Sequence, residues 1–222
     1  NSPMDGKFHM YPKGGTTIEQ IKSAGDSSFT LALGRVGAMS AAKLLDTKCK
    51  VPCEILDLPI GVRGTDNFLN NLRKVAGVHV PDSLMMERGQ LVDVMSDMSQ
   101  YTYNKTAALV GDPDILVSTA EFLVDLGIKI LYVVSGTPAG PKFERRIKEI
   151  AGEDVKVKTG ANADMFYFHQ LIKGNKPDLL FGNTYAKYIA RDEDIPLIRI
   201  GFPIYDRVGH QYMPIMGYKG GL

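Results

Sequence analysis

Two aspartates four residues apart are the pair in this sequence best suited to chemistry. Asp93 and Asp97 lie in a stretch from 83 to 103 whose apolar residues, Leu91 and Met95 among them, recur at helical spacing. On that helix both carboxylates share one face, opposite the apolar stripe, where like charges repel by about 0.2–0.5 kcal/mol. A hard cation with further oxygen ligands would remove this repulsion. A solvated polar face explains the same spacing without any ligand.

Five glycine-containing loops follow the strands expected in the second half of the chain. They span residues 111–114, 135–138, 160–162, 182–184 and 201–203. In an open parallel sheet, ligands bind outside the carboxyl ends of the strands, and helix starts there can hold an anion. None of the loops carries the dinucleotide or P-loop fingerprint. Ordinary turn chemistry is therefore the favoured interpretation of these loops.

The cysteines and histidines give no recognisable ligand or catalytic set. Cys49 and Cys53 have a C-x3-C spacing without a second pair, so we interpret them as idle or buried thiols. The four histidines are far apart in the sequence, and only His210, beside Arg207, falls in a turn suited to function. The run 198–210 enters a proline-containing turn, which suits a site, an interface or simple loop-holding contacts.

The composition excludes several classes of protein. The 222 residues include 26 Lys and Arg against 25 Asp and Glu, a net charge of +1, with 44% hydrophobic and 23% charged residues. These values argue against long disorder and against nucleic acid as a partner. No apolar run approaches the roughly 18 residues of a membrane helix, and the first residues do not resemble a signal peptide. We therefore expect a cytoplasmic protein without membrane contacts.

The second half of the chain reads as strands alternating with helices. The expected strands are 106–110, 130–134, 155–158, 179–181 and 197–200, and the expected helices are 113–126, 141–151, 163–173 and 185–191. Phe166, Leu171 and Ile172 are the core residues expected on the third of these helices. This alternation, with short loops of Gly, Asn, Asp and Pro, predicts an α/β fold with a Rossmann-like, doubly wound parallel sheet.

The first hundred residues are less complete. Strands are expected at 29–33 and 55–58, and helices at 16–24, 36–45, 65–76 and 83–103. Two strands make a poor sheet on their own. We therefore predict a partial Rossmann-like domain at 1–60, a helical bridge at 61–104 and a complete Rossmann-like domain at 105–222.

Long runs of the sequence resemble the β subunit of nitrogenase component 1, of the molybdenum–iron type. In chain order they are DGKFHMY at 5–11, GGTT at 14–17, PIGV at 59–62, TD at 65–66, ERGQLVD at 87–93, GDPD at 111–114, GNTYAKYIARD at 182–192, PLIRIGFPIYDR at 196–207 and GYKGG at 217–221. Because the runs are long and span the chain, the resemblance is specific.

The resemblance implies a function and several cofactors. The β subunit of that family is about twice this long and has three Rossmann-like domains, so this chain resembles its later part. The implied role is in nitrogen fixation, the ATP-dependent reduction of dinitrogen to ammonia, as scaffold and subunit-contact region of an oxidoreductase. The cysteines that bind the P-cluster (8Fe-7S) belong to the earlier half, and Cys49 and Cys53 match none of them. The chain alone is therefore expected to bind no cluster and to be inactive.

The resemblance also implies partners and one metal site. The partners are the nitrogenase α subunit, a second β subunit in an α2β2 tetramer, and the iron protein, which contacts the earlier half. In the family a cation lies between the two β subunits, and Asp93 and Asp97 match two of its ligands. The remaining ligands come from the other β subunit.

The sequence leaves three alternatives open. One is a related scaffold for cofactor assembly, and another is the vanadium or iron-only type of the enzyme, since Val208-Gly-His210 replaces a His-rich stretch seen in many members. The third is a Rossmann-like enzyme that binds a sugar or nucleotide through the Gly-Asp-Pro and Gly-Asn-Thr loops.

Overall fold

The structure is a computed structural model, and it describes residues 15–222. The motif at 5–11 and Gly14, which contribute to the family resemblance, therefore lie outside the described residues. Within residues 15–222, no helix is both long enough and apolar enough to cross a membrane.

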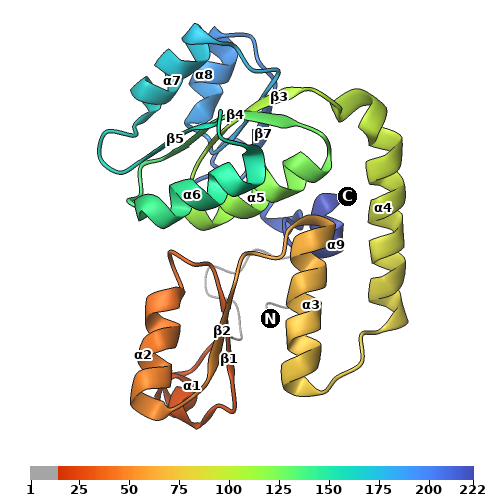
Figure 1. The fold of residues 1–222 in the computed structure, drawn as a ribbon, viewed down its shortest axis with the longest axis vertical. Coiled ribbons are helices and arrows are strands. Elements are labelled where there is room, and N and C mark those ends of the chain that lie inside the picture. The colour runs from red at the N-terminus through yellow and green to blue at the C-terminus, as the bar shows by residue number, and fades with distance from the viewer. Residues whose placement is uncertain (1–14) are drawn as a thin grey trace.

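The later part of the chain forms a five-stranded parallel sheet in the spatial order β5-β4-β3-β6-β7 (Figure 1). The strands are β3 (Thr106–Val110), β4 (Lys129–Ser135), β5 (Lys156–Thr159), β6 (Leu179–Gly182) and β7 (Leu197–Arg199). The chain first builds outward from β3 through β4 to β5, and then returns to the other side of β3 with β6 and β7. This is the doubly wound order, so the predicted fold class is confirmed.

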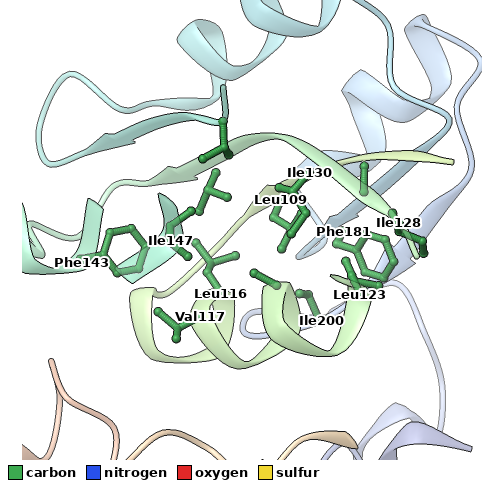
Figure 2. Close-up of a cluster of buried hydrophobic side chains, with 14 residues drawn as sticks. Leu109, Leu116, Val117, Leu123, Ile128, Ile130, Phe143, Ile147, Phe181 and Ile200 are labelled. Carbon is green, nitrogen blue, oxygen red and sulfur yellow. The ribbon is translucent and has the colours of Figure 1, made fainter. Parts of the chain in front are cut away.

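Two pairs of helices cover the two faces of this sheet. They are α5 (Pro113–Asp125), α6 (Gly140–Ala151), α7 (Met165–Gly174) and α8 (Ala186–Asp192). Figure 2 shows the core between the sheet and the pair α5 and α6, where Leu116, Phe143 and Ile147 are buried. The core on the opposite face contains Phe168 and Ile172 of α7. Most of the buried hydrophobic residues of the described chain lie in these two layers.

Local sequence explains where these elements begin. Asp112 and Pro113 start α5, because a proline at the first helical position loses no hydrogen bond. The side chain of Asp164 accepts a hydrogen bond from the backbone N–H of Tyr167 at 2.8 Å and so caps α7. At the sheet edge, Lys156 and Lys158 are exposed while Val157 and Thr159 are partly buried, which is the alternation predicted from the sequence.

A separate two-stranded sheet forms the front of the described chain. Its elements are α1 (Ile18–Lys22), η1 (Ser23–Asp26), β1 (Thr30–Leu33), α2 (Met39–Cys49) and β2 (Cys53–Leu56). The two strands are parallel, and Thr30 pairs with Cys53. Strand β2 therefore begins two residues before the predicted strand at 55–58.

Two long helices join the two sheets, and the end of the chain returns to them. The joining helices are α3 (Gly61–Ala76) and α4 (Asp82–Thr102), and the last elements are η2 (His210–Tyr212) and α9 (Gly217–Gly221). In Figure 1, α9 lies beside α3, and it packs against both α3 and α4. The predicted division at residues 60 and 104 stays a prediction. The position of α9 shows that the last residues contact the predicted helical bridge.

Two expectations about individual elements are wrong. Phe166, predicted as a core residue, is 72% exposed. It precedes the buried Phe168 by two residues, which places it about 200° away around the helix axis. Helix α3 begins at Gly61 rather than at Thr65, because Gly61 takes a φ of +69° that allows the chain to turn directly into the helix.

Candidate functional site

The aspartate pair lies on the solvent-exposed surface of α4. Asp93 and Asp97 are both exposed, four residues apart on one continuous helix, as the sequence predicted. Within residues 15–222, no group of three or more His, Cys, Asp or Glu side chains could hold a metal ion. The described chain therefore offers at most two carboxylate ligands here, and a hard cation would need further oxygen atoms from elsewhere.

A polar cluster of Asp66, Arg88 and Tyr218, the Asp66 cluster, joins α3, α4 and α9. Arg88 donates to both carboxylate oxygens of Asp66, with Nε–Oδ1 at 2.9 Å and Nη2–Oδ2 at 2.8 Å. The hydroxyl of Tyr218 donates to Oδ1 of Asp66 at 2.6 Å. Burial would raise the pKa of Asp66, but the hydrogen bonds from Arg88 and Tyr218 outweigh it and lower that pKa. Burial and the bond to Asp66 raise the pKa of Tyr218.

Two hollows flank the Asp66 cluster. One of about 420 Å³ is lined by Arg73, His79, Asp82 and the members of the cluster. The other, of about 640 Å³, lies between α3, α4 and the end of α5, where it is lined by residues such as Met95 and Ser96. The second hollow separates the middle of α4 from α3, so this part of α4 has little support on its inner side.

The loops at the carboxyl ends of β3, β4 and β6 lie close together at one edge of the sheet. With the start of α7 they line a hollow of about 330 Å³ that includes Gly111, Gly136 and Asn183. However, Asp112 and Asp164 also line it, at the starts of α5 and α7. Carboxylates at these positions repel an anion, so the hollow does not suit a nucleotide phosphate. This geometry counts against the nucleotide-binding form of the third alternative.

Asp206 holds the loop that follows β7. Arg199 donates to it with Nη2–Oδ2 at 2.7 Å, and the hydroxyl of Thr184 donates to its Oδ1 at 2.9 Å. The same hydroxyl accepts the backbone N–H of Tyr205 at 2.8 Å. Hydrogen bonds from Arg199 hold the pKa of Asp206 well below its usual range. The structure thus supports the loop-holding interpretation for Asp206, while Arg207 next to it is exposed.

A second charged group lies between the front sheet and the large domain. This junction cluster consists of Asp57, Arg63, Glu121, Asp125 and Arg146. Arg146 lies 3.3 Å from Asp57 and 3.4 Å from Glu121, and Arg63 pairs with Glu121 and Asp125. Burial raises the pKa of both Glu121 and Asp125. The members come from four separate segments, so spacing in the sequence gave no signal for the cluster.

The two cysteines and His210 are not members of these clusters. Cys49 is exposed and Cys53 partly buried, and both thiols are free. His210 lines a hollow of about 380 Å³ together with Arg199 and Arg207. Elsewhere His169 pairs with Glu193 at 2.6 Å between α7 and the end of α8. None of these residues completes a metal site within residues 15–222.

Comparisons with known sequences find one family. The family profile described as nitrogenase component 1 type oxidoreductase matches residues 2–222. The nitrogenase molybdenum-iron protein beta chain of Clostridium pasteurianum is 47% identical, and the match covers 100% of this chain and 49% of that protein. The beta chain of Methanothermobacter thermautotrophicus is 38% identical over 97% of this chain and 47% of its own length. The chain therefore spans about half the length of the curated relatives it matches.

Solved structures give the same result. A chain described as nitrogenase Cp1 at pH 6.5 superposes with a TM-score of 0.91 and 48% identity, over 99% of this chain and 48% of that one. A chain described as nitrogenase Cp1 at pH 5 gives a TM-score of 0.63 at 15% identity, which shows a shared fold alone. The sequence resemblance to this family is thus confirmed.

Proposed function

The chain belongs to the nitrogenase component 1 type oxidoreductase family, and on that basis we propose that it is the later half of a molybdenum–iron protein β subunit. Its role is to act as a scaffold and to make subunit contacts in an enzyme that reduces dinitrogen to ammonia in an ATP-dependent reaction. The observation that carries the proposal is the 47% identity to a beta chain across the whole of this chain. Because the reaction consumes cellular ATP, we place the assembly in the cytoplasm.

The described residues favour a structural role over a catalytic one. The large sheet has a buried core on each face, and the largest polar clusters join elements of the fold to one another. Within residues 15–222, Cys49 and Cys53 have no further metal-binding side chains beside them. We therefore assign the P-cluster (8Fe-7S) of the whole enzyme, and the contact with the iron protein, to residues outside this chain.

Helix α4 is the surface best suited to a subunit contact. It exposes several large apolar side chains, with exposed fractions from 37% to 68%: Met85, Met86, Val92, Val94, Met98 and Tyr101. An exposed apolar surface of this kind is typical of a site where another protein packs. We infer that the second β subunit covers α4, while the α subunit contacts other parts of the complete enzyme.

The aspartate pair suits one half of a cation site shared between two subunits. Two carboxylates on successive turns match the oxygen ligands that hard cations prefer, and their exposure leaves them open to a partner. A cation would cancel the repulsion between them, and the second β subunit would supply the remaining oxygens. Asp93 and Asp97 would hold the ion, which would contribute charge neutralisation at the contact.

The function is tested with the full-length protein produced together with its own α subunit. We expect an α2β2 tetramer that contains iron and molybdenum and that forms ammonia from dinitrogen when the iron protein and ATP are added. Vanadium in place of molybdenum would assign the other enzyme type. A protein that assembles with cofactor intermediates but never forms ammonia would contradict the proposed role in turnover and indicate the assembly scaffold.

The cation site is tested separately by metal analysis of the tetramer. Asp93→Asn and Asp97→Asn should each remove most of the ion bound between the β subunits, because each removes one charged ligand. Asp154→Asn, which neutralises an exposed carboxylate outside the contact, is the matched control and should leave the ion in place. Unchanged metal content in both Asp93→Asn and Asp97→Asn would exclude these ligands.

A further inference from the structure

Helix α4 is attached to the rest of the chain at two places, near its middle and at its carboxyl end. The first attachment is at Arg88 and Leu91, where Arg88 binds Asp66 and Leu91 is fully buried. The second is at Thr102, whose hydroxyl donates to the backbone carbonyl of Leu126 at 2.8 Å. From residue 92 to residue 100 every residue except Met95 is exposed. The position of this middle stretch is therefore set by the attachments on either side of it.

The aspartate pair lies in that middle stretch, close to the first attachment. At a rise of about 1.5 Å per residue, Asp93 is about 7.5 Å along the helix from Arg88, and Asp97 about 13.5 Å. A tilt of the helix at Arg88 is therefore carried directly to both carboxylates. The hollow of about 640 Å³ beside Met95 and Ser96 leaves the inner side of this stretch only partly packed.

The first attachment depends on the last helix of the chain. Tyr218 of α9 donates to the carboxylate oxygen Oδ1 that Arg88 also contacts, so Asp66 binds both helices at once. The backbone places α9 there, since the N–H of Gly217 donates to the carbonyl of Pro59 at 2.7 Å. Gly221 lies so close to Leu91 that a Cβ at Gly221 would be 2.9 Å from both methyl carbons of the leucine. The fit between α9 and α4 is therefore tight.

The sequence also makes α4 sensitive to this contact. Gly89 lies in the helix directly after Arg88, and apart from its own helix backbone no atom lies within 4 Å of the place its Cβ would occupy. A glycine inside a helix weakens it by about 1 kcal/mol relative to alanine. The helix is thus intrinsically weak at the point where the Asp66 cluster holds it.

We propose that the Asp66 cluster is a clamp that positions the aspartate pair for the cation between the β subunits. Asp66, Arg88 and Tyr218 are positioning residues, because they act on the ion only through the placement of α4. This inference rests on the proposed function. It adds that the C-terminal helix α9 controls the geometry of the cation site.

The test uses the full-length α2β2 tetramer, stripped of the intersubunit ion and titrated with Mn²⁺. Tyr218→Phe keeps the ring but removes the hydrogen bond to Asp66, so we expect Mn²⁺ to bind about threefold to tenfold more weakly. The electron paramagnetic resonance spectrum of the bound Mn²⁺ should also change, because the ligands take a different arrangement. Asp66→Asn, which also removes the charge that binds Arg88, should have a larger effect. Tyr188→Phe makes the same chemical change on an exposed ring of α8 and should behave as the parent protein.

Hydrogen exchange of residues 92–102 in the same tetramers reports whether the clamp holds the helix. We expect faster exchange there in Tyr218→Phe than in Tyr188→Phe. Unchanged Mn²⁺ affinity and spectrum in Tyr218→Phe would overturn the proposal, whether or not exchange becomes faster. Asp93→Asn tests whether the aspartate pair binds the cation at all. If this variant, whose clamp is intact, binds Mn²⁺ as the parent does, the cation site itself is wrong, whatever the clamp does.

Discussion

Asp206 illustrates how one carboxylate fixes a loop by receiving several donors. Arg199 and Thr184 both donate to it, and Thr184 in turn accepts the backbone N–H of Tyr205. The strand β7, the loop after it and the loop after β6 are thereby tied together. The consequence is that the charge state of one side chain controls the arrangement of the C-terminal run.

This dependence predicts how acid affects the protein. The pKa of Asp206 lies below its ordinary value of 3.8, with hydrogen bonds from Arg199 as the largest cause. Its stabilising effect is therefore complete above pH 3.8 and is lost as the pH falls through the lower, folded-state pKa. We expect Asp206→Asn to be less stable than the parent near neutral pH and to show a shallower loss of stability below pH 3.8. Urea unfolding from pH 2 to pH 7 measures the free energy of unfolding of both proteins.

The control is Asp192→Asn, at an exposed position, whose stability should follow that of the parent at every pH. If Asp206→Asn lost stability below pH 3.8 as steeply as the parent does, the assignment would be contradicted.

Some residue roles were open to sequence reasoning and others were not. The pair Asp93 and Asp97 shares an exposed face because helical periodicity alone decides that. The partners Asp66 and Tyr218 are 152 residues apart, and no local pattern links them. The prediction that Phe166 lies in the core is wrong because α7 begins with four consecutive large apolar or aromatic residues. In so short a helix, their spacing does not show which side faces the sheet.

At the scale of elements, glycines mark where helices meet other parts of the chain. Gly61 begins α3 with a φ of +69°, and a Cβ there would lie 2.4 Å from Cδ2 of Phe122 in α5. Gly89, inside α4, has a helical backbone and open space around it. The two glycines therefore have opposite roles, since one permits a close contact and the other only weakens a helix.

Replacing these two glycines by alanine should change stability in opposite directions. Gly61→Ala forces a left-handed backbone and a clash with an aromatic ring, so we expect a loss of about 1–3 kcal/mol in the free energy of unfolding. Gly89→Ala should raise it by about 0.5–1 kcal/mol, because alanine favours the helix. Chemical denaturation of the purified protein measures both. A stabilised Gly61→Ala protein would show that α3 and α5 are not in contact as described.

The alternation of strands and helices was predictable, because each element carries its own periodic pattern and each loop its own turn residues. All five strands of the large sheet lie within two residues of their predicted bounds. The return of α9 to α3 and α4 was not predictable, since a five-residue helix has too short a pattern to indicate its partner. The junction cluster was not predictable for a different reason, because its members come from separate segments of the chain.

The junction cluster determines how the front sheet and the large domain are held together. Arg146 is its centre, because it is the residue that contacts both Asp57 of the front part and Glu121 of the large domain. Desolvation raises the pKa of Glu121 above its ordinary value of 4.5, and the charge of Arg146 is the largest effect that opposes the rise. Between its unfolded and folded pKa values, such a carboxyl binds more protons in the folded protein, so stability falls as the pH rises.

Removal of Arg146 should therefore destabilise the protein more at neutral pH than in mild acid. In Arg146→Gln the pKa of Glu121 rises further, and the fall in stability extends over a wider range of pH. We expect a loss of about 1–3 kcal/mol at pH 7, because Asp57 and Glu121 each lose a charged hydrogen-bond donor, and a smaller loss near pH 4.5. Urea unfolding of the purified protein across this range measures both values.

Arg145→Gln, at the exposed neighbouring position, removes the same charge outside the cluster and should show little change at any pH. If the loss in Arg146→Gln were equal at both pH values, Glu121 would not be the group that responds, and the link between the two parts of the chain would depend on packing rather than on charge.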